Sequence, residues 1–189
     1  MHKPFIFLLS MILLFSCGEK TVECLIVTEM GEIKVELYPD RAPVTVENFL
    51  AYVEAGAYTG SSFFRVCTPE NEAEREIKIE VIQGGDVPED QLQPAIPLET
   101  TETTGLKHLD GTLSMARLEV NTAQSNFFIC IGDQPELDFG GKRHPDGQGF
   151  AAFGQVLSGM DVVRVIQKQK EVNQYLVDSV KIERIIVVK

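Results

Sequence analysis

Short stretches of alternating apolar and polar residues dominate the chain, and this period of two is typical of β-strands. The clearest example covers residues 24–38, CLIVTEMGEIKVELY, where Met30-Gly31 interrupts the alternation and predicts a β-hairpin. Six further strands are predicted at residues 62–66, 77–83, 112–116, 126–131, 150–157 and 180–188. The pattern therefore indicates a domain built mainly from short strands.

Helical spacing occurs in two places. Pro43 suits the first turn of a helix, and apolar side chains then recur at helical intervals until Gly56, where the helix is predicted to end. A second short helix is predicted over residues 160–165. Many short strands joined by Gly-rich and Pro-rich turns favour a sandwich or a closed barrel, and closure removes exposed strand edges.

Residues 68–80, TPENEAEREIKIE, stand out by their density of charge and separate two strand patterns. A charged segment between two strands is usually solvated. We therefore expect a mobile loop or an extended hairpin that tolerates shortening.

The start of the chain has the layout of an export signal. Residues 1–16 combine a basic start with an apolar run that is too short to span a bilayer comfortably. Leu14 to Cys17 resembles a bacterial lipobox, which implies acylation of Cys17, with 17–23 as a lipidated tether and 24–189 as the domain. We expect a lipid-anchored protein of the cell envelope, facing the periplasm. A plain cleaved signal or an uncleaved anchor remains the alternative.

The charge limits the classes of partner. The formal net charge is −11, and removal of residues 1–16 with Lys3 takes it to −12. Such acidity argues against binding to nucleic acid or to anionic lipid head groups. Membrane attachment would therefore come from acyl chains alone.

The cysteines and histidines of the predicted domain form no metal-ligand pattern. Cys24, Cys67 and Cys130 are an odd number, so one pair could form a disulfide while at least one thiol stays unpaired within a monomer. His108 and His144 lack a nucleophile elbow or partner motif, which disfavours a serine or cysteine hydrolase. We expect neither a metal nor a cofactor.

Arg65 lies in GSSFFRV, inside an otherwise apolar, aromatic strand pattern. An arginine keeps its charge, and removing that charge from water is costly without compensation. Either the strand is at an edge and the guanidinium reaches solvent, or the cation faces a functional groove.

Several ordered motifs favour the second interpretation. In chain order they are FFR at 63–65, VIQGGD at 81–86, GTLSMA at 111–116, SNFFI at 125–129 and GFAAFG at 149–154. This order resembles the cyclophilins, which are peptidyl-prolyl cis/trans isomerases, and LDFGGKRHPDGQGFAAFG resembles their bacterial form. The resemblance runs from Cys24 to the C-terminus. It implies a mostly β fold, a closed eight-stranded antiparallel β-barrel capped by two α-helices.

The resemblance also implies the site. Arg65 falls at the catalytic arginine, Gln83 at a glutamine that holds the peptide, and Phe128 at the floor of the proline pocket. Strand alternation adds Val81 to the pocket wall. The remaining expected substrate-binding residues are Met115, Ala116, Arg117, Asn126, Leu137 and Phe150. Substrates would be proline-containing polypeptides, in particular exported proteins that are unfolded or still folding.

Four residues depart from the family pattern. Phe64 replaces a histidine found in many members, and Asn126 replaces a glutamine. Glu80 lies near the position of a pocket phenylalanine, and Glu136 replaces the aromatic that contacts cyclosporin in sensitive members. These changes leave an alternative open, a degenerate cyclophilin that binds peptides as a chaperone or docking module with little turnover.

Overall fold

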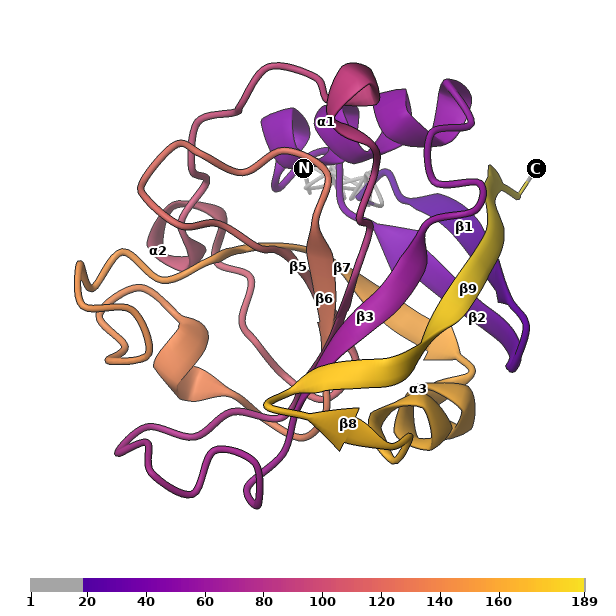
Figure 1. Cartoon of the computed structure of the whole chain (residues 1–189). Coiled ribbons are helices and arrows are strands. Elements are labelled where there is room, and N and C mark those ends of the chain that lie inside the picture. Colours follow the sequence, from indigo (N-terminus) through magenta and orange to yellow (C-terminus); the bar gives the residue numbers. More distant parts are fainter. Residues whose placement is uncertain (1–18, 189) are drawn as a thin grey trace, which may run out of the picture.

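The computed structural model describes residues 19–188, which form a closed antiparallel barrel (Figure 1). The strands pair in the order β1-β2-β7-β5-β6-β4-β3-β9, and β1 pairs with β9 to close the ring. A two-residue strand, β8 (Glu171–Val172), adds only a hairpin to β9. The barrel strands are β1 (Val22–Thr28), β2 (Gly31–Leu37), β3 (Ser62–Cys67), β4 (Val81–Gly84), β5 (Thr112–Met115), β6 (Phe127–Cys130), β7 (Ala151–Ser158) and β9 (Tyr175–Val187). The predicted eight-stranded barrel is confirmed.

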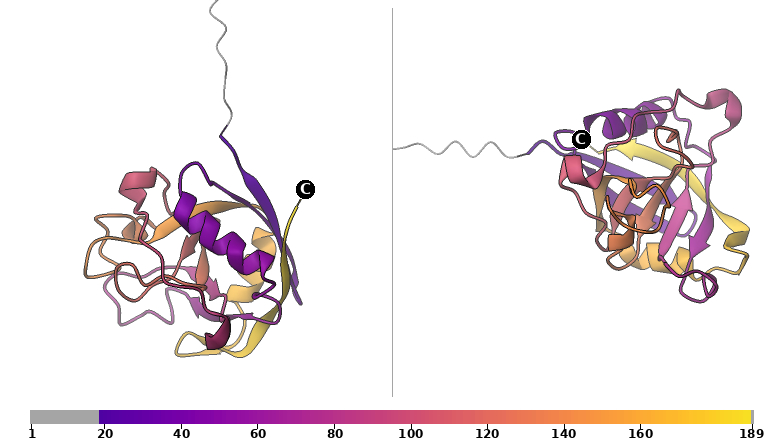
Figure 2. Two further views of the ribbon diagram at one scale, coloured as in Figure 1. Left: turned by 90° about the horizontal axis from the view of Figure 1, so that it is seen from above. Right: turned by 90° about the vertical axis from the view of Figure 1, so that its left-hand side faces the viewer.

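Two helices lie at opposite ends of the barrel, α1 (Pro43–Glu54) and α3 (Met160–Gln167) (Figures 1 and 2). Both were predicted from the sequence. A third helix, α2 (Thr101–Thr104), is a single turn. Four residues are too few to show a helical spacing of apolar side chains, so the sequence did not predict it. Two 3₁₀ turns, η1 (Glu89–Gln91) and η2 (Pro135–Leu137), complete the regular structure of the described residues.

The first turn of α1 is capped from a distant loop. Its N-cap residue, Ala42, has no side-chain oxygen to accept a hydrogen bond from the unpaired amides. Glu99 supplies the oxygens instead, accepting from the N–H groups of Val44 at 3.2 Å and Thr45 at 2.8 Å. A carboxylate there also complements the positive end of the helix dipole.

Alternation along the strands separates two apolar clusters. Phe127 points into the barrel and packs edge to face on Phe49 and Phe63. Its neighbour Phe128 points outward and belongs to a smaller cluster on the outer face of the barrel. The smaller cluster consists of Cys67, Ile79, Val81, Phe128, Cys130 and Leu137.

The strand predicted at residues 77–83 is wrong in its first half, since β4 begins only at Val81. The preceding segment folds over the outer cluster, and Ile79 is buried in that cluster. The side chain of Glu72 is also fully buried. The segment 68–80 is an irregular loop with mostly exposed residues, as expected, but it is anchored at Glu72 and Ile79, which the expectation of a mobile loop did not include.

Cys24, Cys67 and Cys130 are all buried and unpaired. Cys67 and Cys130 lie on either side of Val81 in neighbouring strands, so one strand separates them. Burial raises the pKa of the Cys67 thiol to about 11, even though Arg65 lowers it. These thiols form no disulfide and are weak nucleophiles.

Cys17 and the predicted signal lie outside the described residues. Within residues 19–188, no helix combines the length and apolar character needed to cross a bilayer. The same part of the chain contains no group of three or more His, Cys, Asp or Glu side chains arranged to hold a metal ion.

Candidate active site

A row of four residues crosses four neighbouring strands on the outer face of the barrel. Arg65 on β3 is opposite Gln83 on β4, and Gln83 is opposite Phe128 on β6. Phe128 is in turn opposite Ser114 on β5. Since directly paired residues share one face of a sheet, strand register alone brings a cation, an amide and an aromatic ring together.

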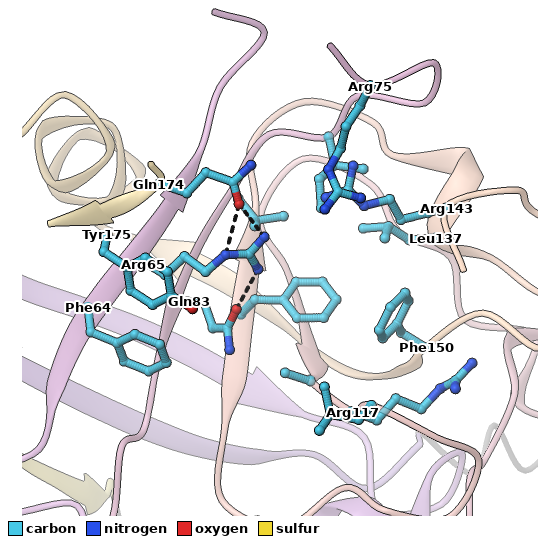
Figure 3. Close-up of a pocket in the computed structure, with 15 residues that line it drawn as sticks. Phe64, Arg65, Arg75, Gln83, Arg117, Leu137, Arg143, Phe150, Gln174 and Tyr175 are labelled. Carbon is cyan, nitrogen blue, oxygen red and sulfur yellow. Dashed lines mark hydrogen bonds between the residues drawn. The ribbon is translucent and has the colours of Figure 1, made fainter. Parts of the chain in front are cut away.

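The guanidinium of Arg65 is held between two glutamines (Figure 3). Its Nη1 donates to Gln83 Oε1 at 2.8 Å. Its Nε and Nη2 both donate to Gln174 Oε1, at 3.0 and 2.5 Å. These bonds use three of the five N–H groups of the arginine, which leaves two for a ligand.

Arg65 and Gln83 lie at one side of a cavity of about 420 Å³, and the apolar Leu137 and Phe150 lie across from them, with further arginines at the rim (Figure 3). Phe128 and Phe150 meet edge to face, with ring centroids 5.6 Å apart. The cavity also gathers most of the expected site residues, including Val81, Ala116, Arg117 and Leu137. A small apolar ring could therefore bind beside a fixed cation.

Arg117 closes one end of this cavity. It donates to both carboxylate oxygens of Asp146, at 2.7 and 2.9 Å, and lies 5.1 Å from the ring centroid of Phe150. The hydrogen bonds from Arg117 hold the pKa of Asp146 well below its ordinary value. Beyond Arg117, a second cavity of about 470 Å³ is lined by Gln83, Ala116 and Asn126 among others.

A buried hydrogen-bonded chain lies beneath Phe128. His108 stacks on the Phe128 ring, and its two ring nitrogens are 2.8 Å from Asp138 Oδ1 and 2.9 Å from Ser114 Oγ. Burial lowers the pKa of His108, although Asp138 acts in the opposite direction. The ring therefore stays neutral at neutral pH and fixes the floor of the cavity from below.

Met115 is the one expected groove residue that lies elsewhere. It is 1% exposed, packs in the main barrel core, and is not among the residues that line either cavity. Alternation explains the error, because Ser114 faces outward on β5 and Met115 must therefore face inward.

The two acidic departures, Glu80 and Glu136, are not among the residues that line the cavity. The Glu80 carboxylate accepts from Gln167 Nε2 of α3 at 3.3 Å, and Val81 rather than Glu80 lines the cavity. The Glu136 carboxylate accepts from the backbone N–H of Lys142 at 2.8 Å. Neither introduces a charge into the groove, which removes most of the argument for a degenerate site.

Several residues around Arg65 were not predicted from the sequence. Gln174 and Tyr175 come from the β8–β9 hairpin, and Arg75 and Arg143 come from two loops (Figure 3). The rings of Tyr175 and Phe64 stack with centroids 6.4 Å apart. The only available signal was Asn173-Gln174 between two short apolar stretches, which is a weak hairpin cue because Gln rarely occupies such turns.

This chain belongs to the cyclophilin-type peptidyl-prolyl cis-trans isomerases. The family described as "Cyclophilin type peptidyl-prolyl cis-trans isomerase/CLD" matches residues 24–187. The resemblance identified from the motifs is thereby confirmed, together with the class of enzyme.

Individual relatives agree. Peptidyl-prolyl cis-trans isomerase A of Dickeya dadantii is 38% identical over 78% of this chain and 72% of its own length. Peptidyl-prolyl cis-trans isomerase B of Escherichia coli is 36% identical over 74% of this chain and 80% of its own length. A crystal structure of a Cryptosporidium parvum cyclophilin-type isomerase superimposes with a TM-score of 0.71 at 22% identity, covering 90% of this chain and 99% of the other, and so supports the fold.

Proposed function

We propose that Arg65 is the catalytic donor of prolyl isomerisation in the cavity between Gln83 and Phe128. Rotation about an X-Pro bond breaks amide resonance and faces a barrier of roughly 18 to 20 kcal/mol. As the bond twists, the proline nitrogen regains its lone pair and becomes a hydrogen-bond acceptor. A fixed N–H donor beside it stabilises the twisted state more than either planar state, which is the requirement for catalysis.

The rest of the cavity suits this role. Phe128, Leu137 and Phe150 offer an apolar surface for the proline ring. Gln83 and the cavity beyond Arg117 can hold the residues before proline while the bond rotates. One observation carries the proposal: Arg65 and Phe128 line the same cavity, and two N–H groups of Arg65 remain free to donate to a substrate.

The test is turnover and peptide affinity on folded Arg65→Ala, measured with a prolyl peptide by NMR exchange. We expect the activation free energy of turnover to rise by about 3 kcal/mol while affinity changes less, by analogy with loss of one oxyanion donor. Arg65→Lys should rescue poorly, because an ammonium cannot reproduce the planar fork. Arg184→Ala, an exposed arginine of β9, is the control. Near-normal turnover of Arg65→Ala would contradict the proposal.

We further propose that the enzyme acts on exported proteins while lipid-anchored in the cell envelope. The support is the lipobox-like sequence ending at Cys17 and the apolar run before it. Cys17→Ser should release the protein from membranes or block its processing. Mass spectrometry that finds an unmodified mature N-terminus beyond Cys17 would refute this.

A further inference from the structure

Gln174 connects the guanidinium of Arg65 to a carboxylate on the other side. Its Oε1 accepts from Arg65, and its Nε2 donates to Glu72 Oε1 at 3.1 Å. Glu72 belongs to the charged segment 68–80, and no hydrogen bond or ion pair joins it directly to Arg65. The three side chains thus form a line from the segment to the arginine.

The carboxylate determines which way the amide of Gln174 faces. An ionised carboxylate can only accept hydrogen bonds, so it selects the NH₂ side of the amide. The carbonyl side must then face Arg65, where it meets the guanidinium donors. With the opposite orientation, an NH₂ group would face a cation and the arginine would lose its acceptor.

Glu72 is itself fixed. Its side chain is fully buried and pairs with Arg143, whose side chain is 7% exposed. The backbone N–H of Ile79 also donates to Glu72 Oε2 at 2.8 Å. Burial raises the pKa of Glu72, but the hydrogen bonds from Arg143 and Ile79 outweigh burial and leave that pKa below its ordinary value. The group is therefore an anion at neutral pH.

We propose that Glu72 is a positioning residue of the isomerase that orients the guanidinium of Arg65 through Gln174. This inference rests on the proposed catalytic role of Arg65. Glu72 does not touch the reacting bond. It sets the direction of the Gln174 amide, and that amide holds two of the three engaged N–H groups of Arg65.

The backbone at Gln174 supports a functional reason for its side chain. Asn173 and Gln174 form the two-residue turn of the β8–β9 hairpin, with φ values of 54° and 75°. Glycine is favoured at such positions, and a glutamine there is strained. The chain nonetheless has a side chain that reaches Arg65, so the strain coincides with a contact at the cavity.

Because the turn is strained, the substitution Gln174→Gly can separate an effect on stability from an effect on turnover. Gln174→Gly should leave the free energy of unfolding unchanged or higher, because it relieves the turn. It should also lower turnover by about three- to tenfold, because Arg65 keeps its charge but loses the acceptor that orients two of its N–H groups, with KM within about twofold. Glu72→Gln should lower turnover similarly, whereas Glu74→Gln, an exposed carboxylate of the same segment, should match the wild type.

The side-chain ¹⁵N–¹H signal of Arg65 Nε gives a readout that a merely structural role would not move. It should be sharp in the wild type and broadened by exchange in Gln174→Gly and Glu72→Gln. Its assignment follows from its disappearance in Arg65→Ala.

The double variant Arg65→Ala/Glu72→Gln completes the test. It should be no slower than Arg65→Ala, because Glu72 acts only through the arginine. Wild-type turnover of Gln174→Gly, or a further loss in the double variant, would overturn the inference while the role of Arg65 stands. Near-normal turnover of Arg65→Ala would instead overturn the proposed function.

Discussion

Gln83 and Gln174 both accept hydrogen bonds from Arg65, but they reach it from different kinds of structure. Gln83 lies opposite Arg65 in the β3–β4 ladder, so the barrel hydrogen bonds fix its position. Gln174 lies in a tight turn, and its orientation depends on Glu72 from another loop. One side of the arginine is fixed by strand register and the other by buried charge. Mutations on the strand side and on the loop side should therefore affect stability and turnover differently.

The largest effect on stability is expected on the loop side. Glu72→Ala leaves the buried Arg143 without its carboxylate and should lower the free energy of unfolding by about 3 to 5 kcal/mol. Glu72→Met combined with Arg143→Met should recover much of that loss, because neither charge then remains buried. Urea unfolding measures both. A loss below about 1 kcal/mol for Glu72→Ala would mean that segment 68–80 is solvated after all.

On the strand side, Phe128→Ala should lower peptide affinity and turnover to a similar extent. Loss of the ring enlarges the existing cavity and should lower stability by about 3 kcal/mol, near the lower end for a buried phenylalanine. Peptide affinity and turnover should fall together, since the floor binds planar and twisted proline alike. Isothermal titration and NMR exchange on one preparation distinguish this from the selective turnover loss expected at Arg65.

The stability of the protein should depend on pH through His108, which lies beneath Phe128 at the floor of the cavity. Burial lowers the pKa of His108 from 6.5, so the unfolded chain takes up a proton first as the pH falls. The stability that depends on the neutral ring is present above about pH 6.5 and is lost below it, until the folded chain protonates as well. His108→Gln should reduce the difference in unfolding free energy between pH 7.5 and pH 5.5, by at most about 1.4 kcal/mol, the value of one pKa unit. An unchanged difference would exclude the ring as its source.

The smallest effect is expected at the far end of the groove. Asn126→Gln restores the residue common in the family beside the second cavity, where the side chain is half-buried and space is ample. Stability should change by no more than about 0.5 kcal/mol. Affinity for peptides extended before proline should rise about twofold, while affinity for a short prolyl peptide should not change. A large effect on the short peptide would place Asn126 nearer to the bond than the cavity does.

The sequence predicted the strand-borne part of the site because it depends on local periodicity. The alternation that turns Phe127 inward turns Phe128 outward, and it also placed Val81 correctly. The same rule, applied strictly, would have excluded Met115. The motifs supplied the closed barrel, because periodicity alone left a sandwich equally open.

The loop-borne part could not be predicted because its partners are far apart in the chain. Glu72 and Arg143 are separated by 71 residues, and a glutamate in a charged segment is usually solvated. The turn at Asn173-Gln174 lacks the glycine that would have marked it. Only the folded barrel brings these residues to Arg65.

The three buried thiols give the protein internal probes of its own opening. An alkylating reagent reacts with a thiolate, and burial raises the pKa of Cys24 to about 12 and that of Cys67 to about 11. Labelling therefore requires local or global unfolding. Cys24 reports on the β1–β9 closure, and Cys67 reports on the edge of the active site. Pulsed alkylation, read by mass for each cysteine, would measure how often each part of the barrel opens without any engineered label.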